Sequence, residues 1–294
     1  MKGIILAGGS GSRLFPATLP ITKQLLDIGG KPMIYYPLTQ LMLAGIRDIM
    51  IISSPRDIGL YQRCLGNGHQ WGIALTYAVQ PRPAGIAQAF FIPSSPGFTS
   101  SIDFIGTDSV TLILGDNIFF GPIDYLLPIR EFKSGALLFA KHVSNPERFG
   151  VIQFDSNDTP VQILEKPSPP PSHFAVTGLY CYDSRVIEHS VRLTPSPRGE
   201  LEITDLNNRY LHDQQAVIIK LRRGVAWFDT GTKEAIQHVR QFIYLQESLQ
   251  EVLIGSPEEV AYRMNFIDND QLEALLNTYP DNEYTQLLKK VIKE

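Results

Sequence analysis

Long apolar segments and secretory signals are both missing from this 294-residue chain. No apolar run approaches the roughly 20 residues that a helix needs to cross a bilayer, which argues against a membrane-spanning protein. The chain opens on Met-Lys-Gly-Ile-Ile-Leu, without the pattern of a signal peptide. The expected location is therefore the cytoplasm.

Cysteine and positive charge are also scarce. The two cysteines, Cys64 and Cys181, are far apart and lack a metal-ligand spacing. One disulfide is conceivable, but two reduced, buried thiols fit a cytoplasmic protein better. The 26 lysines and arginines stand against 30 acidic residues, so the net charge is −4. General nucleic-acid binders are usually basic, which disfavours that class. An anionic substrate would need locally concentrated positive charge.

The first half of the chain alternates short apolar runs with segments of helical spacing. Strands are predicted at residues 3–7, 48–52, 73–79 and 110–114, and helices at 33–44, 57–65 and 84–91. This alternation is typical of a doubly wound, mostly parallel, Rossmann-like α/β sheet. Because such sheets bind ligands beyond the carboxyl ends of their strands, the loops after Ala7 and Leu114 are expected to carry the chemistry.

The second half has a different pattern. Strands are predicted at 135–141, 149–155, 160–165 and 174–182, and helices at 202–213, 232–248 and from 257 onward. These strands suggest antiparallel additions to the sheet. We expect an α/β domain over residues 1–250 and a C-terminal helical extension, 251–294, packed on it. The Ser-, Pro- and Gly-rich segment 93–107 is expected to be a surface loop without evident chemistry.

A glycine-rich turn, residues 8–13, follows the first predicted strand. Glycine lets backbone N–H groups approach phosphate oxygens closely, and Arg13 and Lys23 could add positive charge. A plain tight turn remains an alternative. The turn lacks the Gly-Lys-Ser/Thr of a Walker A loop, and a dinucleotide-binding fingerprint would need glycine at position 14, which is leucine.

Two aspartates follow predicted strands. Asp116 comes just after the strand 110–114, a common position for a Mg²⁺ ligand. Asp229 ends another apolar run, before a turn in which Thr232 is expected to cap the next helix. Capping a turn or helix is the simpler role for either aspartate alone.

Two charged segments lie between these aspartates. Glu165 and Lys166 precede a proline that ends a strand, and alone they read as a surface pair. Arg198 precedes a predicted helix and could reach an anionic ligand, whereas Glu202 and Asp205 could complement the dipole of that helix.

Together and in this order, the segments resemble the sugar nucleotidyltransferases, most closely their thymidylyltransferase branch. The resemblance extends over essentially the whole chain. It rests on residues 2–9, 11, 13, 23–26, 31–38, 41–47, 70–72, 114–119, 176–180, 198–205 and 227–232.

The resemblance implies a Mg²⁺-dependent enzyme that joins the thymidylyl group of dTTP to glucose 1-phosphate. The residues that match the family's catalytic positions are Arg13, Lys23, Asp116 and Lys166, and Asp116 and Asp229 match its metal ligands. Its substrate contacts are matched by Gly8, Gly9, Gly11, Ser12, Gln24, Gln80, Gly85, Gly150, Glu165, Val176 and Arg198. A homotetramer or homodimer that binds neither nucleic acid nor membrane is also implied.

Within this set the resemblance implies distinct roles. The glycine turn wraps the nucleotide phosphates, and Gln80 and Gly85 match contacts to the pyrimidine. Gly150, Glu165 and Val176 match sugar contacts. Lys166 and Arg198 match the pair that holds the sugar phosphate.

Several positions depart from the family pattern. Ala84 stands where aspartate is usual, Phe149 where tyrosine is usual, and segment 93–107 is longer. Arg263 matches the family's regulatory segment, but the following Met264-Asn265 does not, so feedback control stays open. UTP or another hexose 1-phosphate as substrate, and a non-catalytic nucleotide-sugar-binding regulator, are the alternatives; a Rossmann dehydrogenase is disfavoured by the missing glycine.

Overall fold

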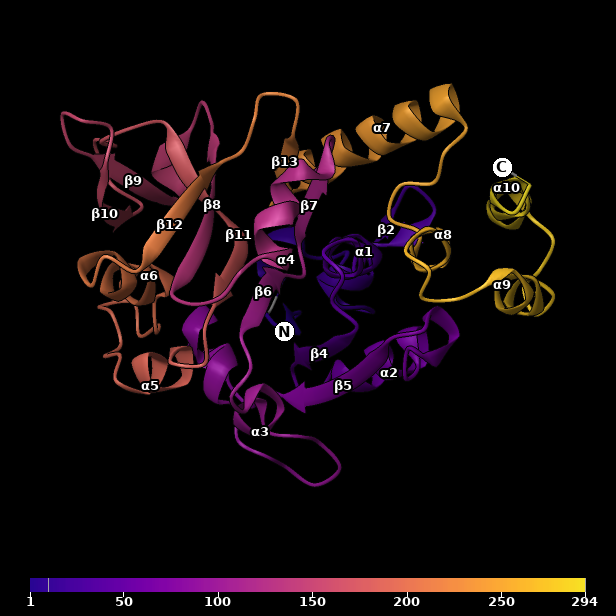
Figure 1. The fold of residues 1–294 in the computed structure, drawn as a ribbon, viewed down its shortest axis with the longest axis horizontal. Coiled ribbons are helices and arrows are strands. Elements are labelled where there is room, and N and C mark those ends of the chain that lie inside the picture. Colours follow the sequence, from indigo (N-terminus) through magenta and orange to yellow (C-terminus); the bar gives the residue numbers. More distant parts are fainter. Residues whose placement is uncertain (10, 294) are drawn as a thin grey trace.

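Nine strands form one central sheet in the part of the chain that the computed structural model describes, residues 1–9 and 11–293 (Figure 1). Four neighbouring strands are parallel and stand in the order β5 (Ala74–Val79), β4 (Asp48–Ser53), β1 (Lys2–Leu6) and β6 (Val110–Leu114). Ile4, Ile5 and Ile51 are fully buried. Apolar runs buried on both faces are typical of parallel sheets, and the predicted Rossmann-like α/β fold is confirmed.

The other five strands pair mostly in the antiparallel sense. The central one, β11 (Phe174–Tyr182), pairs with β6, β8 (Ala136–His142) and β9 (Gly150–Phe154), and β10 (Pro160–Glu165) lies beyond β9. The predicted antiparallel additions are confirmed. The fifth, β12 (Ala216–Lys220), runs parallel to β8 and is absent from the predicted strands, although its Val-Ile-Ile run is typical of a strand.

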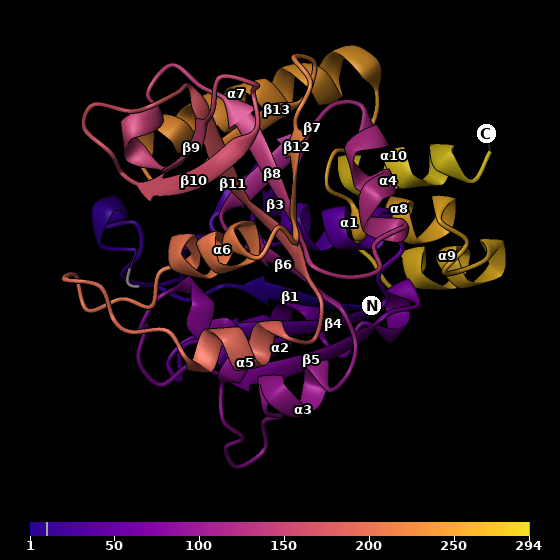
Figure 2. The ribbon, with the colours of Figure 1, turned by 60° about the vertical axis from the view of Figure 1, so that its left-hand side comes forward.

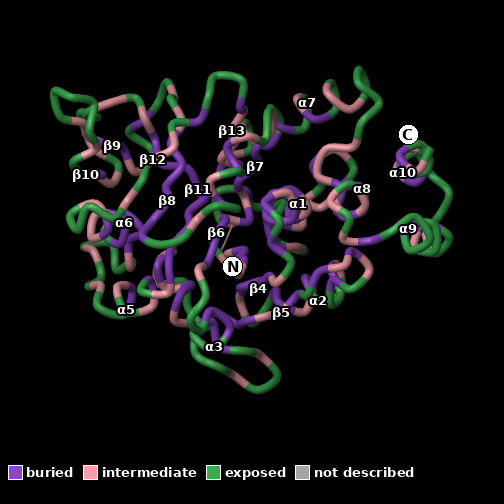
Figure 3. Tube along the Cα trace, in the orientation of Figure 1, coloured by how far each residue is buried: buried purple, intermediate pink, exposed green. Residues whose placement is uncertain are grey.

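Helices cover both faces of the sheet (Figure 2). Successive strand residues point to opposite faces, so Ile5 and Ile4 belong to different hydrophobic clusters. The cluster of Ile5 includes residues of α1 (Tyr35–Leu43) and α2 (Ile58–Leu65), and that of Ile4 includes residues of the 3₁₀-helix η4 (Ile86–Phe91), α5 (Val186–Val191) and α6 (Ile203–His212). Figure 3 shows the sheet strands largely buried between these layers.

A small two-stranded ladder stands at the carboxyl end of β6. It pairs β7 (Asn117–Phe120) with β13 (Ala226–Asp229), in antiparallel register. The long helix α7 (Lys233–Gln250) begins just after β13, and its predicted cap is confirmed because the Thr232 hydroxyl accepts a hydrogen bond from Ala235 N. A hairpin of β2 (Asp27–Ile28) and β3 (Lys31–Pro32) packs beside α7.

Three helices end the chain: α8 (Pro257–Arg263), α9 (Asn269–Leu276) and α10 (Glu283–Val291). Ser256 caps α8 with proline in its first turn, as predicted. Ala261, Leu272 and Leu288 join the same cluster as Ile5, so these helices share the main core. The division of the chain at residue 250 stays a prediction. No helix of the described residues is long and apolar enough to cross a membrane.

One sequence expectation is wrong. The segment 93–107 is not only a surface loop, because residues Ser101–Ile105 form helix α3. The Ser100 side chain caps this helix by accepting hydrogen bonds from Ile102 N and Asp103 N. Phe104 and Ile105 are buried in the core, which supplies the packing that the Ser- and Pro-rich composition concealed.

The two cysteines are free, as expected. Cys181 is fully buried, whereas Cys64 is only partly so. The buried thiol lies 3.1 Å from the hydroxyl oxygen of Thr111 on the neighbouring strand.

A buried carboxylate joins the C-terminal helices to the rest of the molecule. Glu258, only 1% exposed, accepts hydrogen bonds from the Trp71 indole at 3.1 Å and the Tyr279 hydroxyl at 2.9 Å. Its other oxygen accepts from Ser256 Oγ at 3.1 Å and from the Tyr284 hydroxyl. A buried polar group is costly unless its hydrogen bonds are satisfied, and here four neutral donors satisfy this one.

Replacing Glu258 by glutamine is expected to destabilise the protein by about 1–3 kcal/mol, because the new amide N–H₂ faces groups that are themselves donors. The midpoint of urea unfolding, followed by tryptophan fluorescence, measures the change. Glu251→Gln is the control: it breaks an exposed pair with Lys290 and should leave the midpoint unchanged. Equal midpoints for the two variants would contradict the role of Glu258.

Candidate active site

Asp116 and Asp229 lie side by side although 113 positions separate them in the chain. Asp116 follows β6, and the β7–β13 ladder pairs Asp229 with the next residue, Asn117. Thr230 fixes the junction, since its backbone N and its Oγ1 both donate to the Asp116 carbonyl, at 3.2 and 2.8 Å. Both carboxylates line one cavity. The ladder therefore unites the two residues predicted to hold a metal.

Positive side chains surround this pair of carboxylates. Lys23 Nζ lies 2.5 Å from Asp116 Oδ2, and Arg148 Nη2 lies 3.8 Å from Asp229 Oδ2. Arg13 approaches over Gly231, where an added Cβ would lie 3.2 Å from its Nη1 and 3.3 Å from Asp229 Oδ2. Glycine at 231 thus leaves room for the close approach.

The surroundings of Asp229 shift the pKa of its carboxyl group. Burial, followed by the negative charge of Asp116, raises the pKa of Asp229. Lys23, Arg148 and Arg13 act in the opposite direction but do not cancel the rise. Burial and the neighbouring carboxylate thus disfavour the charged form of Asp229, and a cation bound beside it would favour that form.

The carboxylate pair is suited to a particular class of metal. Among the described residues no cluster of three or more His, Cys, Asp or Glu side chains could hold a metal ion. Mg²⁺ is usually held by one or two carboxylates together with substrate phosphates and water, not by a complete protein cage. Two carboxylates beside a glycine-rich turn fit that pattern.

The glycine turn lines a cavity of about 360 Å³ on one side of the aspartates. The lining includes every predicted residue of this segment that the structure describes: Gly8, Gly9, Gly11, Ser12, Arg13, Lys23 and Gln24. Ser10 lies outside the described residues. Gln24 also supports the turn, because its Nε2 donates to the Gly8 carbonyl at 3.3 Å. Gly9 and Gly11 have φ of +109° and +58°, conformations that favour glycine.

Gln80 and Gly85 lie beside this cavity and do not line it. Gln80 is buried, and its Oε1 would be 2.8 Å from a Cβ at position 8, so a larger residue there would displace the Gln80 amide. Gly85, at φ +107°, packs directly on the Leu201 backbone. Their contact with a pyrimidine stays a prediction.

A second cavity, of about 280 Å³, lies on the other side of the aspartates. It shares Arg13, Asp116 and Glu200 with the first cavity. The predicted residues that line it are Arg13, Asp116, Gly150, Glu165, Lys166, Val176, Arg198 and Asp229. The structure thus brings both predicted substrate regions to Asp116, and the second of them also to Asp229.

Charged groups of the second cavity are already interlinked. Arg198 Nη2 contacts Glu165 at 3.2 Å and Glu202 at 2.8 Å. Lys166 Nζ lies 3.4 Å from Glu165, which also accepts from Thr204 Oγ1 at 2.7 Å. The expectation that Glu202 complements a helix dipole is incomplete, because its carboxylate binds Arg198. These contacts hold the two cations at the cavity.

Several lining residues were not predicted. Arg148, Asn117 and Trp227 all line the second cavity. A signal for two of them was present, since Arg148 precedes the Phe149-Gly150 pair and Asn117 follows Asp116. Phe149, which lacks the family's hydroxyl, packs its ring 5.0 Å from that of Trp227. Arg263 lines neither cavity and pairs with Glu259 at 2.7 Å.

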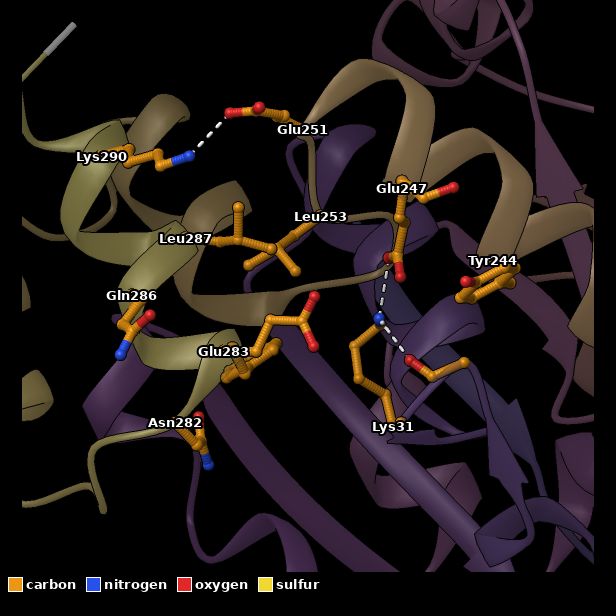
Figure 4. Close-up of a pocket in the computed structure, with 14 residues that line it drawn as sticks. Lys31, Tyr244, Glu247, Glu251, Leu253, Asn282, Glu283, Gln286, Leu287 and Lys290 are labelled. Carbon is orange, nitrogen blue, oxygen red and sulfur yellow. Dashed lines mark hydrogen bonds and ion pairs between the residues drawn. The ribbon is translucent and has the colours of Figure 1, made fainter.

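A larger cavity, of about 730 Å³, lies away from these residues, between α7 and α10 (Figure 4). Lys31 is paired there with Glu247 at 2.8 Å, and Lys290 with Glu251 at 2.6 Å. Its cations are thus matched by carboxylates of this same chain. The smaller pair of cavities at the carboxyl end of β6 is the better candidate for chemistry, because predicted catalytic residues converge only there.

Known proteins resemble the whole chain. A family model described as nucleotidyl transferase matches residues 2–246. A protein from Neisseria meningitidis named glucose-1-phosphate thymidylyltransferase is 48% identical over 100% of both chains, and one of the same name from Xanthomonas campestris is 47% identical over 99% of this chain and 97% of its own.

Among solved structures, a Bacillus anthracis protein described as a candidate glucose-1-phosphate thymidylyltransferase, crystallised with sucrose, superposes with a TM-score of 0.75 at 39% identity. The match covers 87% of this chain and 98% of that one. With a family model over most of the sequence and relatives that align from end to end, the chain belongs to the nucleotidyl transferase family.

Proposed function

We propose that the protein transfers the thymidylyl group of dTTP to glucose 1-phosphate, giving dTDP-glucose and pyrophosphate. The names of relatives at 41–48% identity support this reaction. The observation that carries the proposal is the meeting of two cavities at Asp116 and Arg13, with Asp229 and Lys23 beside them. That arrangement suits two anionic substrates that react where the cavities join.

The two cavities differ in what they offer a ligand. The first presents a glycine turn with backbone N–H groups and Lys23, which suits the phosphates of a nucleotide. The second presents Lys166 and Arg198 among carboxylates and hydroxyls, which suits a sugar that carries one phosphate. We therefore assign dTTP to the first cavity and glucose 1-phosphate to the second.

The main obstacle to this reaction is repulsion between the substrates. Two like unit charges about 4 Å apart repel by roughly 4 kcal/mol at an effective dielectric constant of about 20. Arg13 and Lys23 can neutralise the nucleotide phosphates, while Lys166 and Arg198 neutralise the sugar phosphate. Catalysis is effective when such charged side chains already point at the substrates before the reaction begins.

We propose Mg²⁺ as the cofactor, held by Asp116 and Asp229. When bound, it would polarise phosphoryl oxygens and offset the charge of the two carboxylates. Burial, followed by the charge of Asp116, raises the pKa of Asp229, and a cation held by both carboxylates would stabilise their charged forms, which supports this assignment. Lys23 contacts Asp116 Oδ2 and would lie beside the metal and the nucleotide phosphates.

The attacking group needs no activation by the protein. The second pKa of a phosphate monoester is about 6, so the sugar phosphate is already an anion at neutral pH. Its oxygen attacks the α-phosphorus of dTTP in line with the leaving pyrophosphate. Among the described residues that line either cavity there is no histidine or cysteine. The side chains here bind and orient, and no proton transfer to the protein is required.

We further propose a homotetramer or homodimer located in the cytoplasm, as in the sequence expectation. Against the alternative of a non-catalytic regulator, the chain retains both aspartates and all four cations of the proposed reaction.

Turnover with paired substrates tests the proposed function. Pyrophosphate release is measured for dTTP and UTP, each with glucose 1-phosphate and with galactose 1-phosphate. The highest kcat/KM is expected for dTTP with glucose 1-phosphate. Because one methyl group in a pocket gives only roughly 10- to 200-fold discrimination, UTP should be a weaker but detectable substrate. No pyrophosphate from any pair would refute the proposal.

Asp116→Asn should reduce kcat by at least about 100-fold, because the amide binds Mg²⁺ weakly and no longer pairs with Lys23. Pyrophosphate release over a range of Mg²⁺ concentrations measures the effect. A near-normal rate at limiting Mg²⁺ would contradict the metal role.

Lys166→Ala should raise the KM for glucose 1-phosphate by about 10-fold or more and leave the KM for dTTP nearly unchanged, because only the second cavity loses a cation. Lys133→Ala removes an exposed lysine that lines neither cavity and serves as the control. A KM change confined to dTTP would reverse the assignment of the two cavities.

A further inference from the structure

One buried amide connects the elements that carry the two aspartates. Asn117, 2% exposed, donates from Nδ2 to Asp116 Oδ1 at 3.0 Å. Its Oδ1 accepts from Trp227 Nε1 at 2.7 Å and from Gly178 N at 3.0 Å. Trp227 lies on β13, two residues before Asp229. A single side chain thus contacts Asp116, the strand of Asp229, and β11.

The main sheet is interrupted where this amide binds it. Pairing of β11 with β8 shifts between Val176 and Tyr180, so the Gly178 N–H is free to bond to Asn117. A Cβ on Gly178 would lie 2.6 Å from Asn117 Oδ1, closer than real Cβ contacts come. Glycine at 178 is therefore what admits the amide to the backbone of β11.

We propose that Asn117 is a positioning residue that fixes the carboxylate of Asp116 for metal binding. The inference rests on the proposed function and extends it to a residue that does not touch the substrates' reacting atoms. With Oδ1 held by the amide, rotation of the carboxylate is restricted and Oδ2 is directed at Lys23.

Only an amide meets all the demands of this position. Its oxygen accepts two N–H groups, while its nitrogen donates to a carboxylate. An aspartate at 117 would still accept from Trp227 and Gly178, but it could not donate to Asp116. It would also add a third carboxylate beside the two that line the cavity.

Two variants test the role of this amide: one changes Asn117 itself and the other changes the neighbouring Gly178. Asn117→Asp removes the donor. Gly178→Ala keeps Asn117 but displaces its amide by the steric contact described above. Gly59→Ala is the matched control, because an added Cβ there meets only the flexible end of Arg63, at 3.8 Å.

Both variants are expected to raise the Mg²⁺ concentration for half-maximal activity by about 10- to 100-fold, the usual cost of losing a partner of a metal ligand. The KM values for dTTP and glucose 1-phosphate, at saturating Mg²⁺, should change far less. The second readout needs no turnover: Mn²⁺ binding to the full chain, measured by electron paramagnetic resonance, should weaken by a similar factor. Gly59→Ala should match the wild type in both readouts.

Thermal unfolding and circular dichroism identify any variant that fails to fold, and the metal measurements are read from the variant that folds. Normal Mn²⁺ affinity and normal Mg²⁺ dependence in a folded variant would overturn the inference. Any loss of thermal stability in that variant would then show that Asn117 is a structural residue only. Loss of the proposed function is seen separately, as absence of pyrophosphate release by the wild type.

Discussion

Two like charges held next to each other are the constraint on which the rest of this structure depends. Asp116 and Asp229 are placed together by the β7–β13 ladder, and burial together with the charge of Asp116 raises the pKa of Asp229. Lys23, Arg13 and Arg148 lie nearby and act against this rise. In the proposed function, the two carboxylates stand where a cation and two polyanions would meet.

The parallel sheet explains why the charges can be held so closely. β6 is buried among apolar residues on both faces and delivers Asp116 to the edge of the sheet. Asp229 reaches the same edge from a strand outside the main sheet, and its Trp227 neighbour is tied to β7 through Asn117. A rigid support of this kind keeps oriented charges in place without reorganisation during a reaction.

Local pattern predicted much of the fold, and the physical reasons for the exceptions are specific. β1, β4 and β6 were predictable because a buried parallel strand is a continuous apolar run. α3 was not, because its stability comes from Phe104 and Ile105 packing into a distant core and not from its Ser- and Pro-rich surroundings. For the site, the strand ends indicated Asp116 and Asp229 singly, but their pairing depends on a ladder between segments over 100 residues apart. Asn117 also bonds to Trp227 and Gly178, and Arg148 contacts Asp229, between segments far apart in the chain, so no local pattern contains these contacts.

The arrangement also explains why the site has so few reactive groups. A phosphate monoester is already a nucleophile at neutral pH, so a serine, cysteine or histidine would add nothing to the attack. In water, nothing holds the triphosphate, the sugar phosphate and the cations that neutralise them in one fixed arrangement. Lys166 and Arg198 illustrate the solution, since each is kept at the cavity by Glu165 before any ligand arrives. A phosphate that replaces Glu165 as their partner exchanges one ion pair for another, so much of the cost of ordering those side chains has been met during folding.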